Sequence, residues 1–348
     1  MKVSVVIPTF NNEDTIGATV ESALTQRFDG EFEVIVVNDG STDGTPAELA
    51  KFGDRIRMID QENRGVSPAR NAGIAAAAGE YIALLDGDDW WTGDKLSKTV
   101  PVLERNPAAV AVFSDVMQVD GAGKEYGSYV LPEFRHSPTL DEMLASPWPA
   151  LPSSTVFRRD TLITIGGFSE QFSRFAHYGE DTFAFLLARE QGEIDFVADK
   201  LVRYRVSGFN GHLARRNQSR DNNDRGNRGI EEFVDPERQV GGLLVFARLV
   251  QQHFGVRGRK LAEWAIDYVA KNLVATGLKA MHEGNRELAR RCYVSSIRKR
   301  PLVLKTYVRL AWTVLPPSVT EMLSPMLPPQ LRRSLSGPPF HGLEDRTE

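Results

Sequence analysis

The sequence predicts an α/β protein whose sheet is mostly parallel and is flanked by helices on both faces. Short apolar runs and helical patterns alternate over the first 120 residues. The runs are apolar without a break, which is typical of strands that are buried on both faces of a sheet. Strands that alternate with helices in this way form parallel, Rossmann-like βαβ units.

The expected elements follow one another in a regular order. The first apolar run, 3–7, is expected to end at Pro8. A helix at 15–26 has Asp14 or Thr15 as its N-cap. Pro68 suits the first turn of an Ala-rich helix at 67–78. The other expected elements are strands at 33–37, 57–59, 81–85, 110–117 and 154–157, and helices at 95–105 and 181–190.

Length and composition are those of an ordinary globular protein. The chain has 348 residues, of which 41% are apolar and 25% are charged. Its single cysteine, Cys292, excludes an intramolecular disulfide and a zinc site with several cysteines. No run of 18 apolar residues could form a membrane-spanning helix, and the short apolar N-terminus does not resemble a signal peptide. We therefore expect a cytoplasmic protein.

Charge is distributed unevenly along the chain. Residues 1–110 carry 10 basic and 18 acidic side chains, whereas residues 203–309 carry 22 and 10. The segment 207–229 is rich in Gly, Asn and Arg, which is typical of a flexible linker or lid. Helical patterns follow, and a Pro-rich end closes the chain. The predicted divisions are an α/β domain at 1–225, an α-helical region at 226–335 and a disordered tail at 336–348.

The residues that follow the strands carry the chemistry, because ligands bind at the carboxyl ends of strands in an open parallel sheet. The strongest signal is Asp86-Gly87-Asp88-Asp89, directly after a buried strand. Three carboxylates so close together repel one another, and bound Mg²⁺ or Mn²⁺ relieves that repulsion. The alternative is an acidic turn without a metal. Neither G-x-G-x-x-G after the first strand nor a P-loop occurs, which argues against Rossmann redox enzymes and P-loop enzymes.

Five sequence blocks resemble family 2 glycosyltransferases, which have the GT-A fold. The blocks are VVIPTFN at 5–11, VNDGSTDGT at 37–45, NRG at 63–65, PARNAG at 68–73 and LLDGDD at 84–89. Their order and spacing fit the family over the first 110 residues. A weaker resemblance extends to about residue 206, through Gly179-Glu180-Asp181 and Tyr204-Arg205. The helical C-terminal third lies outside the resemblance.

The resemblance implies a nucleotide-sugar donor, with a UDP-sugar favoured, and inversion at the anomeric carbon. Thr9, Phe10 and Asp39 would hold the nucleotide, with the Asp39 carboxylate accepting an N–H of the base. Arg70 would lie near the base or the phosphates. Taken alone, Asp39 would be a turn-forming residue in Asp39-Gly40-Ser41.

The resemblance also implies a divalent cation, Mn²⁺ or Mg²⁺. Asp86 and Asp88 would form the D-x-D pair at the ribose and the metal, and Asp89 would support their loop. Many relatives place a metal-binding His two residues after Tyr-Arg, whereas Ser207 stands there in this chain. His212 could replace it as a metal ligand, although a single histidine in a loop usually binds no metal.

The motif Glu180-Asp181 opens a helical pattern, and the resemblance assigns the catalytic base to it. Asp181 would take the proton from the attacking acceptor hydroxyl, and Glu180 would bond the acceptor or the base. The alternative for Asp181 is capping of the helix N-terminus, and the two roles can coincide. Trp91 could stack on an acceptor sugar or pack under the next helix, and Arg205 could belong to a lid over the donor diphosphate.

We therefore predict an inverting, metal-dependent glycosyltransferase. It would move a sugar, as hexosyltransferases do, to a saccharide or lipid-linked acceptor in cell-surface polysaccharide synthesis. One alternative is a sugar-phosphate nucleotidyltransferase, which would need a Gly-rich, Arg-containing loop after the first strand. The other is a catalytically silent nucleotide-sugar-binding or scaffold protein, against which the intact Asp86, Asp88 and Asp181 argue.

A basic segment at 286–315 has two interpretations. Eight cationic side chains lie between 286 and 309, opposed only by Glu287, and apolar residues interleave with the later ones. Such a segment can lie on an anionic membrane, which would place the protein at the inner membrane face. Alternatively, its apolar side packs on the catalytic domain. Nucleic acid is not an expected partner, since no known binding module accompanies the charge.

Overall fold

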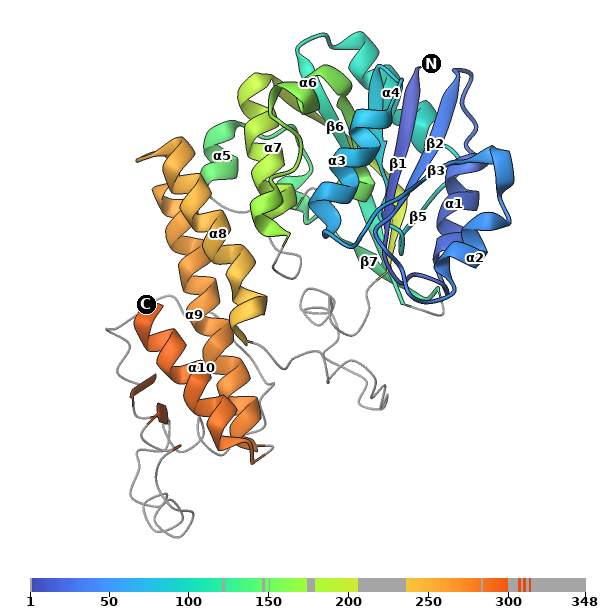
Figure 1. Cartoon of the computed structure of the whole chain (residues 1–348). Coiled ribbons are helices and arrows are strands. Elements are labelled where there is room, and N and C mark those ends of the chain that lie inside the picture. The colour runs from blue at the N-terminus through green and yellow to red at the C-terminus, as the bar shows by residue number, and fades with distance from the viewer. Residues whose placement is uncertain are drawn as a thin grey trace.

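The computed structural model describes residues 2–120, 123–145, 148–149, 151–173, 179–205, 236–282, 284–299 and five residues between 306 and 313. An α/β layer contains the N-terminal elements, and a stack of long helices stands beside it (Figure 1). The predicted lid at 207–229, His212 and the predicted tail at 336–348 lie outside the described residues.

The N-terminal half of the sheet is parallel, as the apolar runs predict. It contains β1 (Val3–Thr9), β2 (Phe32–Asn38), β3 (Arg57–Asp60) and β4 (Tyr81–Leu84). Strand β1 pairs with both β2 and β4, and all seven of its residues are buried. The prediction that this strand ends at Pro8 is wrong, because Pro8 pairs with Val37 and β1 continues to Thr9.

The rest of the sheet is mixed. Strand β8 (Thr155–Arg158) is antiparallel to both β4 and β6 (Ala109–Val119), and β9 (Glu193–Arg205) is parallel to β6. The short strands β5 (Trp90–Trp91) and β7 (Glu125–Ser128) pair antiparallel with β9 and β6. The strand order is β3-β2-β1-β4-β8-β6-β9-β5.

Seven helices accompany the described part of this sheet. They are α1 (Ile16–Leu24), α2 (Thr45–Ala50), α3 (Val66–Ala76), α4 (Lys95–Arg105), α5 (Leu140–Ala145), α6 (Arg159–Thr164) and α7 (Glu180–Gln191). Short 3₁₀ turns are η1 (Gly53–Arg55), η2 (Pro132–Phe134), η3 (Pro152–Ser154) and η4 (Glu170–Phe172).

Alternate strand residues enter two separate cores, as expected when both faces of a sheet are covered. Val5 and Ile7 of β1 pack with α1 and α4 on one face. Val6, between them, packs with α3 and α7 on the other. The carboxyl ends of the strands therefore remain the place where polar loops can meet.

The C-terminal helices continue one of these cores. They are α8 (Pro236–Phe254), α9 (Arg259–His282) and α10 (Arg286–Lys299). Phe246 of α8 belongs to the same apolar cluster as Phe183 and Phe185 of α7. Helix α10 instead packs its buried Ala289 and Tyr293 near the end of α9. A bilayer-spanning helix is absent from the described residues.

Candidate active site

The acidic loop, residues 86–89, lies directly against the end of β1. Gly87 permits this approach: a Cβ on Gly87 would lie 2.9 Å from Thr9 Oγ1 and 2.9 Å from Asn12 Oδ1. The Thr15 hydroxyl donates a hydrogen bond to the Gly87 carbonyl at 2.9 Å. Two of the five sequence blocks are therefore in contact at the carboxyl edge of the sheet.

This contact predicts that Gly87→Ala weakens nucleotide binding by at least about tenfold and costs about 1–3 kcal/mol of stability, because the added methyl forces the acidic loop away from β1. Titration with UDP and Mn²⁺ and chemical unfolding measure the two effects. Gly17→Ala in α1 is the control, since its Cβ would meet nothing closer than 3.9 Å. Equal behaviour of the two variants would contradict the prediction.

Asp39 follows β2, is 3% exposed and holds a loop. One carboxylate oxygen accepts bonds from Gln61 Nε2 at 2.6 Å and the Arg64 N–H at 2.9 Å. The other accepts the Gly65 N–H at 2.8 Å. Asp39 thus fixes the loop that leads into α3, a role that the sequence did not reveal.

The remaining residues predicted at the nucleotide lie near the same edge. Thr9 is buried and its hydroxyl donates to Asn12 Oδ1 at 3.0 Å, whereas Phe10 is 44% exposed. The Thr9 carbonyl accepts the Asp39 N–H at 2.9 Å, so the ends of β1 and β2 are joined. An exposed aromatic ring beside two ordered strand ends is a suitable surface for a nucleobase.

Arg70 connects the acidic loop to the start of α7. Its guanidinium donates to Asp86 Oδ1 at 2.7 Å and to Glu180 Oε1 at 3.3 Å, and Arg70 is 3% exposed. The guanidinium lies 5.1 Å from the centre of the Phe168 ring. Burial opposes the charged form of Arg70, but the two carboxylates outweigh it and raise the pKa of Arg70 above its ordinary value. One buried cation therefore joins the two carboxylate motifs.

Asp181, next to Glu180, lies in an environment that raises the pKa of its carboxyl group. Burial and then the Glu180 carboxylate raise the pKa of Asp181 to about 7, against the opposing effects of the Thr182 N–H and Arg70. Asp181 Oδ1 accepts the Thr182 N–H at 2.6 Å. A carboxyl group with a pKa near 7 is about half ionised at neutral pH and is well matched to proton transfer.

Asp89 points into the protein. It is 1% exposed, and its two carboxylate oxygens accept the Ser153 hydroxyl at 2.6 Å and the Arg205 N–H at 3.0 Å. Burial, followed by the nearby carboxylates of Asp88 and Asp86, raises the pKa of Asp89. These contacts are those of a residue that supports the acidic loop. Ser153 lies outside the five blocks, and no sequence signal pointed to it.

The two tryptophans after the acidic loop differ in exposure. Trp91 is 4% exposed and its indole N–H donates to the Ser153 carbonyl at 2.7 Å, so of the two alternatives for Trp91 the structure favours packing. Trp90 is partly exposed, and the Arg205 guanidinium lies over its ring, 4.9 Å from the ring centre. Arg205 Nε also donates to the Asp88 carbonyl at 3.1 Å. Arg205 therefore contacts the acidic loop directly.

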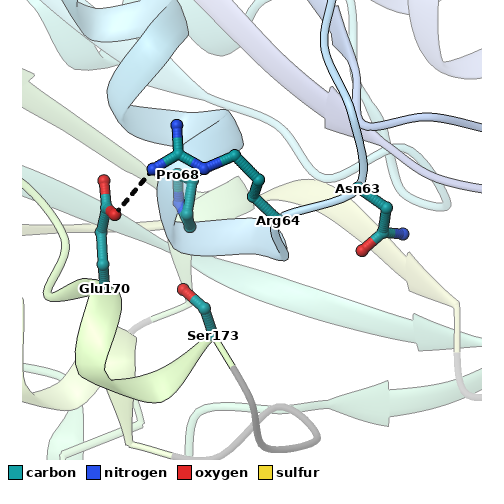
Figure 2. Close-up of a pocket in the computed structure, with 5 residues that line it drawn as sticks. All are labelled: Asn63, Arg64, Pro68, Glu170 and Ser173. Atoms are coloured by element: carbon teal, nitrogen blue, oxygen red, sulfur yellow. Dashed lines mark hydrogen bonds and ion pairs between the residues drawn. The ribbon is translucent and has the colours of Figure 1, made fainter.

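A pocket lies beside the loop that Asp39 holds. Its lining residues are Asn63, Arg64, Pro68, Glu170 and Ser173 (Figure 2). Arg64 Nη2 pairs with Glu170 Oε2 at 3.1 Å across it, and both side chains are more than half exposed. This exposed pair bridges the loop that Asp39 holds to the η4 turn.

The acidic loop contains three carboxylates, those of Asp86, Asp88 and Asp89. Within the described residues, no three His, Cys, Asp or Glu side chains form a metal cluster. Asp89 is committed to Ser153 and Arg205. Asp86 and Asp88 are the other two carboxylates of the loop, and Mg²⁺ or Mn²⁺ in nucleotide sites uses one or two carboxylates together with phosphate oxygens.

Comparisons with known proteins support the resemblance of the five blocks. Residues 4–165 match the model of glycosyl transferase family 2. The chain is 29% identical over 243 residues to an uncharacterized glycosyltransferase of Nostoc sp., covering 66% of this chain and 73% of that protein. It is 43% identical over 122 residues to the succinoglycan biosynthesis protein ExoO of Rhizobium meliloti, covering 34% of this chain and 35% of ExoO.

Solved structures share the fold. The crystal structure of S. aureus TarS 1-349 in complex with UDP-GlcNAc aligns with a TM-score of 0.60 at 19% identity, over 90% of this chain and 89% of that one. The crystal structure of S. aureus TarS aligns with a TM-score of 0.57 at 18% identity, over 96% and 55%. The likeness confirms the expected GT-A fold with a helical C-terminal region. Residues 4–165, a little under half of the chain, are therefore similar in sequence to glycosyl transferase family 2, and the fold agrees with that similarity.

Proposed function

We propose that this protein transfers a sugar from a nucleotide-diphosphate sugar to an acceptor hydroxyl, with inversion at the anomeric carbon. The observation that carries the proposal is the buried Arg70, which joins Asp86 of the acidic loop to Glu180 beside Asp181. This arrangement brings the acidic loop, which would bind the donor, and Asp181, which would act as the base, into one polar cluster. Residues 84–89 and 179–181 are far apart in the chain, so the fold itself creates the juxtaposition.

The reaction is a single displacement. The Asp181 carboxylate accepts the proton of the acceptor hydroxyl while the hydroxyl oxygen forms a bond to the anomeric carbon. The bond between that carbon and the diphosphate oxygen breaks, and the diphosphate leaves with the bonding electrons. Glu180, held by Arg70, keeps Asp181 in an environment where proton uptake is favourable at neutral pH.

Asp86 and Asp88 are the residues that would hold Mn²⁺ or Mg²⁺ at this site. A divalent cation would neutralise the charge that develops on the departing diphosphate. Phe10 and Thr9 would contact the base, and Asp39 would either accept a base N–H with its remaining capacity or act through the loop it orders. A UDP-sugar is the donor that we favour, since the fold neighbour TarS is described in complex with UDP-GlcNAc.

The acceptor that we propose is a saccharide or lipid-linked glycan of cell-surface polysaccharide synthesis. The similarity to ExoO, a succinoglycan biosynthesis protein, supports this class. The exposed basic side chains of α10 suit electrostatic contact with anionic lipid at the inner membrane face, and they include Arg290, Arg291, Arg298 and Lys299. Because Ala289 and Tyr293 are buried, the apolar side of α10 would not insert into the lipid.

Incubation with a panel of nucleotide sugars, with and without Mn²⁺, tests the proposal. The expected result is release of nucleoside diphosphate from one class of donor, together with Mn²⁺-dependent thermal stabilisation by the matching nucleoside diphosphate. At a concentration of 100 Kd, binding adds about 2.7 kcal/mol to the stability. A catalytically silent binding protein would be stabilised without release. A sugar-phosphate nucleotidyltransferase would release pyrophosphate from a nucleoside triphosphate instead.

Asp88→Ala is the diagnostic variant in the same assay. The Mn²⁺-dependent part of the stabilisation is expected to disappear, because one of two cation-binding carboxylates is lost. Asp54→Ala is the matched control, since Asp54 is exposed in the η1 turn away from the acidic loop. Unchanged Mn²⁺ dependence in Asp88→Ala would remove the metal assignment.

A further inference from the structure

A buried serine from a distant segment holds the acidic loop, and we propose that Ser153 is a positioning residue for donor binding. Ser153 lies in the η3 turn and is 0% exposed. Its hydroxyl accepts the Asp86 N–H at 3.0 Å and donates to Asp89 Oδ2 at 2.6 Å. One hydroxyl thus joins the first and last residues of the loop. The inference rests on the proposed function, because it takes this loop as the donor site.

The η3 turn is itself fixed from two sides. The Ser153 carbonyl accepts the Trp91 indole N–H at 2.7 Å. The Ser154 carbonyl accepts the Lys95 ammonium group at 2.5 Å, and Ser114 Oγ accepts it at 3.2 Å. Lys95 is 0% exposed, and burial lowers its pKa to about 7. Two buried side chains that follow the acidic loop in sequence therefore return to anchor the turn that holds it.

The position of Asp86 explains why this anchoring bears on function. Asp86 Oδ1 bonds the Arg70 guanidinium at 2.7 Å, so a shift of its backbone would disturb the link from Arg70 to Glu180. Asp86 is also one of the carboxylates proposed to bind the cation. Groups that hydrogen-bond to ligating residues commonly contribute 10- to 100-fold to metal affinity or activity. Small displacements of such groups have large effects on binding and rate.

Without the Ser153 hydroxyl, the Asp86 N–H and the Asp89 carboxylate each lose one hydrogen-bond partner. The Asp86 N–H has no acceptor from Ser153, and the Asp89 carboxylate loses one donor while keeping the Arg205 N–H. Moving the loop toward water would cost the least free energy, because buried polar groups without a hydrogen-bond partner are unfavourable. Thr19 still donates to the Asp89 carbonyl at 2.7 Å, so the movement should centre on Asp86.

The test compares Ser153→Ala with Ser154→Ala in the full chain. Ser154 is equally buried, but its hydroxyl donates to the Leu151 carbonyl at 2.8 Å, within its own turn. Hydrogen–deuterium exchange of residues 86–91 is expected to accelerate at least about tenfold in Ser153→Ala and to stay unchanged in Ser154→Ala. The affinity for UDP with Mn²⁺ is expected to fall about 10- to 100-fold only in Ser153→Ala.

Ser153→Cys provides a second variant of nearly equal volume, should the alanine variant fold poorly. Its thiol is a weak donor and acceptor, so exchange of residues 86–91 should again accelerate. Exchange at the wild-type rate in both Ser153 variants would overturn the proposal, whether or not UDP binds. Absence of UDP binding by the wild-type protein would instead contradict the proposed donor class, and the exchange rates would still decide whether Ser153 holds the acidic loop.

Discussion

Asp181→Asn is expected to lower the rate of sugar transfer by about 10²- to 10⁴-fold while leaving UDP affinity within a few-fold of wild type. The amide has nearly the shape of the carboxyl group but cannot accept the proton of the acceptor hydroxyl. Measuring transfer under single-turnover conditions and UDP binding by titration separates the two effects. Transfer at the wild-type rate would show that Asp181 is not the base.

The same substitution is expected to stabilise the protein at pH 8. The pKa of Asp181 is raised to about 7 in the folded state from an ordinary value of 3.8. The native protein therefore binds this proton more tightly than the unfolded chain, and stability from Asp181 is lost as pH rises through 7. Asn carries no such penalty, so Asp181→Asn should gain about 1–3 kcal/mol at pH 8 and almost nothing at pH 4.

Asp160→Asn is the matched control for both measurements. Asp160 lies in the first turn of α6, as Asp181 lies in the first turn of α7, but Asp160 is exposed. The control should keep full transfer activity and show no stability gain that grows with pH. A gain in stability at pH 8 in both variants would indicate a general effect of removing negative charge. It would contradict the claim that burial beside Glu180 makes ionised Asp181 unfavourable.

Arg70→Met is expected to destabilise the protein by about 3–5 kcal/mol at pH 8, because a buried ion pair loses one partner. The Arg70 guanidinium now lies between the carboxylates of Asp86 and Glu180. Without it, these two carboxylates and that of Asp181 would repel one another. The loss should shrink at pH 5, below the raised pKa of Asp181 of about 7, because protonation of Asp181 removes one of the negative charges. Chemical unfolding at the two pH values measures the effect, and transfer activity should be lost with it.

Arg64→Met controls for the loss of a paired arginine. Arg64 also pairs with a carboxylate, but its side chain is 61% exposed and that of Glu170 is 51% exposed. Exposed pairs contribute about 0–1 kcal/mol, and the backbone N–H that Arg64 donates to Asp39 is retained. A loss of stability in Arg64→Met as large as that in Arg70→Met would contradict the importance of burial at Arg70.

Much of the N-terminal fold was predictable because its strands are buried on both faces. Helix α4 has the predicted bounds, Lys95–Arg105, and the four parallel strands lie where the apolar runs place them. Strand β9 was not predicted, since its middle residues are charged and exposed and its identity depends on pairing with β6. The antiparallel insertion of β8 between β4 and β6 also depends on tertiary contacts that leave no periodic signal.

Motifs in the sequence indicated which residues gather at the site but not how they interact. The contact between Arg70 and Glu180 joins residues 110 positions apart, and only the fold, which places α3 and α7 at the same core, brings them together. Ser153 belongs to no recognisable motif, because its two contacts with the acidic loop require only one buried hydroxyl group. Similarly, one interpretation of the basic segment was that its apolar side packs on the catalytic domain, whereas α10 packs against α9.

The stereochemistry of the transferred sugar tests the single displacement at Asp181 most directly. Once the panel has identified a donor with an α-linked sugar, proton NMR of the isolated product reads the anomeric configuration. A β-linked product is expected, because one carboxylate base activates the acceptor and the diphosphate leaves from the opposite side. A product that retains the α configuration would contradict this mechanism.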